Sequence, residues 1–240
     1  MIITVGAIKG GVGSTTLVAN LAIERALSGK RVVVVDMDHD QHALTYFMAT
    51  RIEKERTPVI QVIQVPYGDK LTIDDSLKAK YDDIIIDCPI RRGIDYLGAL
   101  KLTDKWIVPV CPTPLQYWSL EKLRRIAADA NAVRSTLLEA TVVGSRVPPT
   151  DRQSIDDCLT DLCSRMAGFR RAKALITYQF AYVPAEFDAA GVGELDLDDN
   201  ASWDTAQREI KRLVAEIYAA ERFARHAAAG LLGTEPLAVD

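Results

Sequence analysis

A glycine-rich segment near the N-terminus places the strongest constraint on the fold of this chain. Residues 9–16 read KGGVGSTT, between an apolar run at residues 2–8 and a predicted helix at residues 15–28. Glycines allow backbone N–H groups to converge on an anion, and the N-terminus of a helix adds positive potential. We therefore interpret the segment as a phosphate-binding loop. A tight turn without a ligand is the less favoured alternative.

The rest of the chain alternates between strand and helix patterns. The predicted strands are residues 2–8, 31–36, 59–65, 84–87, 106–110, 140–146 and 173–177. The predicted helices are residues 15–28, 41–56, 73–80, 92–102, 115–133, 154–167 and 201–220. Residues 31–36, RVVVVD, show no polar alternation, which is typical of a parallel strand buried on both faces. The pattern predicts an α/β fold with a doubly wound, mostly parallel sheet flanked by helices, and a single domain over residues 1–240.

Composition excludes several classes of protein. With 48% hydrophobic and 26% charged residues, the chain is neither disordered nor fibrous in character. A net charge of −4 argues against a protein that is basic overall, although it leaves room for a local basic patch. The four cysteines are scattered and no signal peptide is recognised, so we expect a cytoplasmic location. No apolar run is long enough to predict a membrane-spanning helix.

Four segments together resemble the motifs of the ParA/MinD superfamily of ATPases. They are KGGVGSTT at residues 9–16, VVVVDMD at 32–38, YDDIIIDCP at 81–89 and VPVCPTPLQYWS at 108–119. The first matches the family's loop pattern KGGxGK[ST][ST], except at one position. The resemblance covers most of the chain, and it implies a P-loop NTPase type of fold with ATP or ADP and Mg²⁺ as ligands.

The resemblance also implies roles for individual residues. The residues expected to bind the nucleotide are Gly10, Gly11, Val12, Gly13, Ser14, Thr15, Thr16, Ser145 and Arg146. The last two match a late loop near the adenine, for which an ordinary loop is the alternative. Thr15 matches the hydroxyl that coordinates Mg²⁺, with Asp36 and Asp87 beside the ion. For these two aspartates the alternative is a solvated carboxylate at a strand end.

Two further residues are expected to take part in catalysis. Lys9 matches the signature lysine, which in this family reaches across a dimer interface to the partner's nucleotide. Asp38 matches the switch carboxylate that orients the attacking water. The family usually continues with Pro-Gln after this aspartate, whereas this chain has His39-Asp40-Gln41, so the switch geometry is expected to differ.

Ser14 is the departure with the largest chemical consequence, because the family has a lysine there that contacts the β- and γ-phosphates. A charged hydrogen bond contributes roughly 1.5–3 kcal/mol, so its loss weakens nucleotide binding about ten- to a hundredfold. Hydrolysis should suffer at least as much. Three explanations stay open: slow hydrolysis with Lys9 or another cation compensating, nucleotide binding without turnover, or a serine introduced deliberately to trap one state.

The resemblance extends to partners. It implies a homodimer in the ATP state, non-specific DNA binding, nucleoid association and a ParB-like or other adaptor, as in plasmid or chromosome partition. Candidate DNA-binding residues are Arg165, Arg170, Arg171, Lys173, Arg208, Lys211 and Arg212. Their alternative is a solvated helix face. Two other functions are alternatives: a hydrolysis-deficient regulatory protein, and a MinD-like factor that associates with membrane through residues 222–232. We expect no stable membrane insertion.

Overall fold

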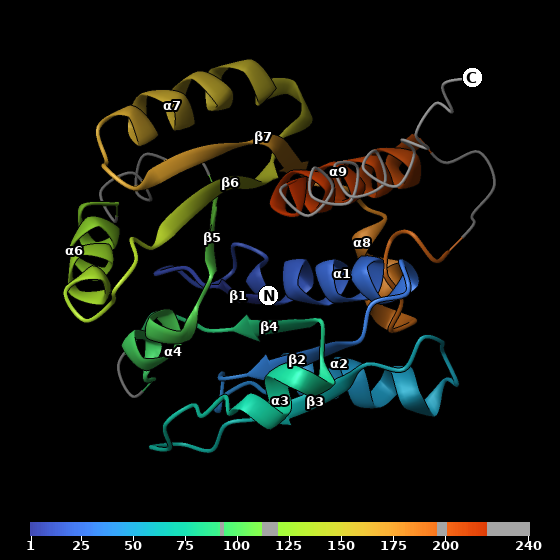
Figure 1. The fold of residues 1–240 in the computed structure, drawn as a ribbon. Helices are drawn as coiled ribbons and strands as arrows, with labels where there is room; N and C mark the ends of the chain where they lie inside the picture. The colour runs from blue at the N-terminus through green and yellow to red at the C-terminus, as the bar shows by residue number, and fades with distance from the viewer. Residues whose placement is uncertain (92–93, 112–119, 196–200, 220–240) are drawn as a thin grey trace, which may run out of the picture.

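The computed structural model describes residues 1–91, 94–111, 120–195 and 201–219. Its strands are β1 (Ile2–Val5), β2 (Val32–Asp36), β3 (Gln61–Gln64), β4 (Asp83–Asp87), β5 (Lys105–Val110), β6 (Glu139–Val147) and β7 (Phe169–Thr177). Its helices are α1 (Ser14–Leu27), α2 (Ala43–Glu53), α3 (Asp75–Lys80), α4 (Tyr96–Leu102), α6 (Leu120–Asn131), α7 (Arg152–Ser164), α8 (Tyr182–Phe187) and α9 (Ala201–Ile217), with a short 3₁₀ turn, η1 (Pro149–Asp151). Figure 1 shows this chain path.

The seven strands form one sheet in the order β3-β2-β4-β1-β5-β6-β7, and every neighbouring pair is parallel. Residues of β1, β2 and β4 are buried throughout, as expected for strands covered on both faces. The order reverses direction at β1, which lies between β4 and β5. The predicted doubly wound α/β fold is confirmed.

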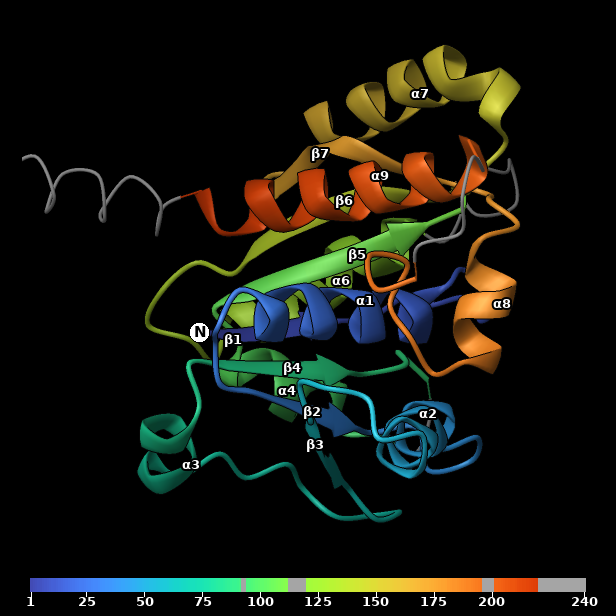
Figure 2. The same ribbon diagram turned by 90° about the vertical axis from the view of Figure 1, so that its right-hand side faces the viewer.

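Helices cover both faces of this sheet. Apolar residues of α1, α2 and α9 form one hydrophobic cluster with strand residues such as Ile3 and Val34. Residues of α6 and α7 pack with Val108 and Val142 in a second cluster on the other face. Figure 2 shows α1 and α9 in front of the strands. Within the described ranges, no helix is both long enough and apolar enough to cross a membrane.

Several element boundaries differ from the predicted ones. β1 ends at Val5 rather than residue 8, because the chain turns there into the glycine-rich loop. β7 begins at Phe169, four residues before the predicted start, and it is an edge strand on which charged side chains are tolerated. α4 begins at Tyr96 rather than 92, where the Asp95 carboxylate accepts a hydrogen bond from Gly98 N.

Two helices differ further from the predictions. The predicted helix at 115–133 begins outside the described residues, and its described part is α6. The helix α8 was not predicted at all. It is only six residues long and contains Pro184, so the sequence pattern gives it a weak signal. α8 is nevertheless important, because it borders the site described next.

Candidate functional site

The glycine-rich loop joins the end of β1 to the start of α1. Gly11 and Gly13 have φ angles of 75° and 83°, in the left-handed region that favours glycine. Leu17 N donates to Gly13 O at 2.9 Å and so closes the first turn of α1. The N–H groups at the start of a helix lack partners within it. The loop therefore presents backbone donors and the positive end of the α1 dipole to one space.

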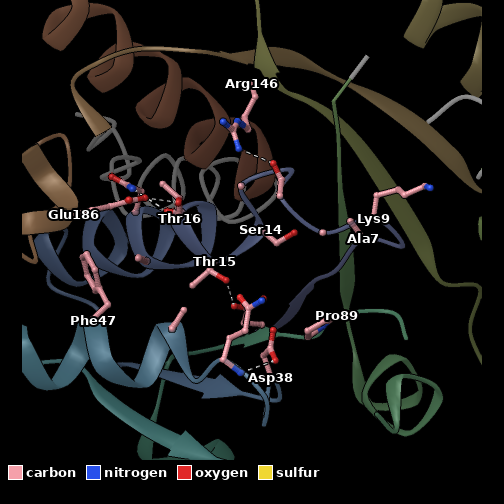
Figure 3. Close-up of a pocket in the computed structure, with 18 of the residues that line it drawn as sticks. Ala7, Lys9, Ser14, Thr15, Thr16, Asp38, Phe47, Pro89, Arg146 and Glu186 are labelled. Atoms are coloured by element: carbon pink, nitrogen blue, oxygen red, sulfur yellow. Dashed lines mark hydrogen bonds between the residues drawn. The ribbon is translucent and has the colours of Figure 1, made fainter. Parts of the chain in front are cut away.

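That space is a cavity of about 670 Å³ at the carboxyl ends of β1, β2 and β4. Ligands of open α/β sheets bind at this edge. The predicted residues that line it are Lys9, Gly10, Gly11, Gly13, Ser14, Thr15, Thr16, Asp38, Asp87 and Arg146. In Figure 3 Ser14, Thr15 and Asp38 lie around the same space, whereas the Lys9 side chain points away from Thr15 and Asp38.

Thr15 and Asp87 form a side-chain hydrogen bond within the cavity lining. Thr15 Oγ1 donates to Asp87 Oδ2 at 2.6 Å, and Asp87 is buried. Burial raises the pKa of the Asp87 carboxyl to about 7, the Thr15 hydrogen bond opposes this shift, and Asp36 and Asp38 add to it. A buried carboxylate near two others is an environment that a cation would stabilise.

Thr15 and Asp87 fit a magnesium ion whose other ligands are nucleotide phosphate oxygens and water. Over the described ranges, no group of three or more His, Cys, Asp or Glu side chains is arranged to hold a metal ion. Mg²⁺ commonly uses one or two protein groups and completes its shell with phosphate oxygens and water. Thr15 and Asp87 provide such a minimal set, so the predicted assignment suits their chemistry.

Asp36 has a different set of contacts. Its Oδ1 accepts from Asp38 N at 2.9 Å, and its Oδ2 accepts from Thr45 N at 3.0 Å and Thr45 Oγ1 at 2.7 Å. Asp36 is buried and is not among the described residues that line the cavity. The carboxylate thus joins the end of β2 to the first turn of α2. Its assignment beside Mg²⁺ stays a prediction.

Asp38 is held by the segment that follows it and by an arginine. Its Oδ1 accepts from Asp40 N and Gln41 N, both at 3.2 Å, and it also pairs with the guanidinium of Arg91. Arg91 Nη2 lies 3.0 Å from Asp40 Oδ2 as well. The residues that replace the family's Pro-Gln therefore wrap around the Asp38 carboxylate and bring a second carboxylate to Arg91.

The predicted adenine-site residues lie directly beside the loop. Ser145 Oγ donates to Val12 O at 2.7 Å, and both residues are buried. Arg146 Nη1 donates to Gly11 O at 2.8 Å, and its guanidinium lies 5.5 Å from the centre of the Tyr178 ring. A second cavity of about 180 Å³ adjoins this point, lined by both residues and by Tyr178 among others. The contribution of Ser145 and Arg146 to adenine binding stays a prediction.

Two charged residues of the described cavity lining were missed by the sequence motifs. Arg91 lies four residues after Asp87, and a search for cations in the loop after that strand would have found it. Glu186 lies on α8, and its Oε1 accepts from Thr16 Oγ1 at 2.6 Å (Figure 3). It is 170 residues away from Thr16, and no local pattern joins them.

The predicted DNA-binding residues are distributed over α9, β7 and the end of α7. Three of them lie on α9 and are exposed: Arg208, Lys211 and Arg212. The others lie at the end of α7 or on β7, and α7 and α9 cover opposite faces of the sheet. Arg165 pairs with Asp161 at 2.8 Å, and Arg171 pairs with Asp156. These two arginines are therefore partly neutralised.

Comparison with known proteins identifies the class to which this fold and site belong. The model of the CobQ/CobB/MinD/ParA nucleotide-binding domain matches residues 3–222. The chain is therefore a member of that family of nucleotide-binding domains.

Individual relatives share just over a quarter of their aligned residues with this chain. The sporulation initiation inhibitor protein Soj of Bacillus subtilis is 27% identical over 165 residues, covering 54% of this chain and 64% of Soj. The chromosome partitioning protein ParA of Myxococcus xanthus is 28% identical over 166 residues, covering 54% of this chain and 57% of ParA. The chain thus spans less than two thirds of the length of these two relatives.

Solved structures match over nearly the whole chain. A plasmid partition protein from Borrelia burgdorferi B31, bound to AMPPNP, has a TM-score of 0.61 at 19% identity and covers 92% of this chain and 98% of its own. The cell division ATPase MinD of Pyrococcus furiosus has a TM-score of 0.63 at 18% identity, covering 91% of this chain and 98% of its own. At these identities the likeness shows the shared fold.

Proposed function

We propose that this chain binds ATP with Mg²⁺, dimerises in the ATP state, and positions DNA or a large cargo, as a partition or positioning ATPase. The observation that carries the proposal is the cavity of about 670 Å³, where the glycine-rich loop, the start of α1, Thr15 and Asp87 meet. Backbone donors suit the phosphates, and the Thr15–Asp87 pair suits the ion. The Soj and ParA relatives support the role in partition.

Each residue group has a role in this proposal. The loop backbone from Gly10 to Gly13 binds the phosphates, while Ser145 and Arg146 hold the loop at Val12 and Gly11. Asp38 orients the attacking water. Lys9, whose side chain points away from Thr15 and Asp38 in Figure 3, acts on the nucleotide of a second subunit. Mg²⁺, when bound, neutralises phosphate charge and organises the oxygens around the reacting phosphorus.

Ser14 makes hydrolysis weak. It is the first residue of α1 and lines the cavity, but its hydroxyl has no charge to offset the γ-phosphate. The same observation supports a second function, in which nucleotide is a structural ligand of a regulatory protein that does not turn it over. A membrane-associated role would depend on residues 222–232, which lie outside the described residues.

Calorimetric titration with Mg-AMPPNP tests the proposal, with wild type, Ser14→Lys and Ser28→Lys compared. Ser28 is exposed at the other end of α1, so its replacement adds the same charge far from the cavity. We expect wild type to bind, and Ser14→Lys to bind about ten- to a hundredfold more tightly. No binding by wild type and by Ser14→Lys would refute the proposal.

Two further measurements separate the candidate functions. ATP hydrolysis by wild type, slow but stimulated by DNA or by an adaptor, supports the ATPase, whereas an absence of turnover in both wild type and Ser14→Lys supports the regulatory role. Light scattering during gel filtration reports the dimer. We expect the mass to double with Mg-AMPPNP and to stay that of a monomer with ADP.

A further inference from the structure

The side chains that line the cavity contain three candidate cations to replace the missing loop lysine. Over the described residues of the lining, they are Lys9, Arg91 and Arg146. Lys9 points away from Thr15 and Asp38 in Figure 3. Arg146 is engaged by Gly11 O and by the Tyr178 ring. Arg91 is therefore the remaining candidate for the cation that replaces the loop lysine.

The backbone places Arg91 at the mouth of the glycine-rich loop. Cys88 N donates to Val5 O at 3.0 Å, and Ile90 N donates to Ala7 O at 3.1 Å. These bonds carry the pairing of β4 with β1 beyond the sheet, into the segment that leads to Lys9. Arg91 is the next residue after Ile90, so its position relative to the loop is set by main-chain hydrogen bonds.

The guanidinium of Arg91 is only partly satisfied by the residues around it. Nη2 contacts the carboxylates of Asp38 and Asp40. Nε is buried and has no acceptor among the described residues. A buried donor without an acceptor is destabilising. Since the guanidinium is a planar fork, a phosphate group can accept from Nε and Nη2 together.

We propose that Arg91 binds the γ-phosphate within its own subunit and so supplies the positive charge that Ser14 does not. This inference rests on the proposed function. Before nucleotide binds, the charge of Arg91 is balanced by Asp38 and Asp40. Nucleotide binding exchanges those carboxylates for phosphate oxygens and satisfies Nε. The same exchange releases Asp38 Oδ1 from Arg91, so one event completes the phosphate site and frees the water-orienting carboxylate.

A comparison of AMPPNP with ADP tests this role, because only AMPPNP carries a γ-phosphate group. We would measure dissociation constants for Mg-AMPPNP and Mg-ADP by calorimetry in wild type, Arg91→Ala, Arg91→Gln and Arg31→Ala. Arg31 is an exposed arginine that also pairs with an aspartate, Asp82, outside the cavity. We expect both Arg91 variants to weaken AMPPNP about ten- to a hundredfold and to change ADP less than threefold. Arg31→Ala should change neither.

Two more variants test the compensation directly. Asp40→Asn removes one carboxylate that competes for Arg91, and should strengthen AMPPNP binding. In a Ser14→Lys background, the loss caused by Arg91→Ala should shrink, because the loop lysine again supplies the charge. The glutamine variant guards against a fold defect specific to alanine, and circular dichroism checks both.

The outcomes are distinguishable from failure of the proposed function. If wild type binds neither nucleotide, both proposals are wrong. If wild type binds both nucleotides and the Arg91 variants lose affinity for neither, or for both equally, the role of Arg91 is wrong and nucleotide binding stands. An undiminished effect of Arg91→Ala in the Ser14→Lys background would likewise overturn the compensation.

Discussion

At the scale of single residues, Asp87 shows how a binding site can reduce the stability of the protein that carries it. Its carboxylate is buried, and burial raises its pKa to about 7. In the folded protein without ligand, this group contributes stability that is full below its unfolded pKa near 4 and is lost as the pH rises through about 7. The ligand-free protein therefore has its lowest contribution from Asp87 to the free energy of unfolding above about pH 7, where the carboxylate is ionised and able to bind a metal ion.

Asp87→Asn is expected to stabilise the protein in the absence of ligand. The amide keeps an acceptor for Thr15 Oγ1 and removes the cost of burying a charge, on the order of 1–3 kcal/mol at pH 8. The gain should be smaller at pH 5, where Asp87 is protonated. Urea unfolding at the two pH values measures it, with Asp69→Asn as an exposed control. The variant should also lose the stabilisation given by Mg-AMPPNP, and equal gains at both pH values would contradict this account.

Local motifs in the sequence predicted several residues that the structure brings together. The loop glycines, Thr15, Asp38 and Asp87 all lie at or after strand ends, and the structure brings them to one cavity. Arg91 and Glu186 were missed because neither belongs to a repeated pattern. Their contacts are with residues distant in sequence, Asp38 and Thr16, and such pairs form only once the sheet is assembled.

At the scale of elements, the junction between the loop and α1 depends on Gly13. Its φ is 83°, and an added Cβ would lie 3.3 Å from Ser145 Oγ. Gly29, at the other end of the same helix, has a φ of 82° with nothing within 4 Å of an added Cβ. The two glycines thus share the backbone conformation but differ in their surroundings.

Gly13→Ala should destabilise the protein more than Gly29→Ala. Each substitution costs about 1–2 kcal/mol for a left-handed alanine, and Gly13→Ala also disturbs the Ser145–Val12 hydrogen bond. Thermal unfolding measures the difference. Nucleotide binding should be abolished only in Gly13→Ala, because Gly13 lines the cavity and Gly29 does not. Equal loss of binding in both variants would mean that general stability, rather than loop geometry, is responsible.

The elements themselves were largely predicted, and the exceptions have physical causes. Strands such as β2 are continuous apolar runs, which the sequence marks clearly. β7 was predicted to start at 173, yet it begins at Phe169 and includes Arg170 and Arg171, which an edge strand accepts. α8 has only six residues and is stabilised by its tertiary contacts.

At the scale of the whole molecule, the basic residues divide between two faces. The exposed group on α9 shares its face with α1, whereas Arg165 belongs to the opposite face and is paired with Asp161. Because the chain has a net charge of −4, DNA binding requires a local patch. We propose that α9 is the stronger candidate for it.

Replacing Arg208, Lys211 and Arg212 with alanine is expected to weaken non-specific DNA binding in the presence of Mg-AMPPNP by at least tenfold. The salt dependence should become shallower by about one unit of log–log slope for each DNA phosphate that the variant no longer neutralises. Fluorescence anisotropy over a range of salt concentrations measures both. The matched control replaces Arg165 and Arg171, whose charges are partly neutralised, and should have a small effect. A larger effect of the control would place the DNA surface on the β7–α7 side.

The central position of β1 sets the order in which the protein is able to assemble during translation. Ile3 pairs with Ile85 on one side and with Lys105 on the other. The strands that pair with β1 are therefore synthesised about 80 to 100 residues after it. At about 5–20 residues per second, the delay is on the order of ten seconds. Throughout it, the first strand and the glycine-rich loop have no sheet to hold them. A ribosome-bound chain that stops before β4 therefore carries the complete phosphate-binding motif without either strand that pairs with β1.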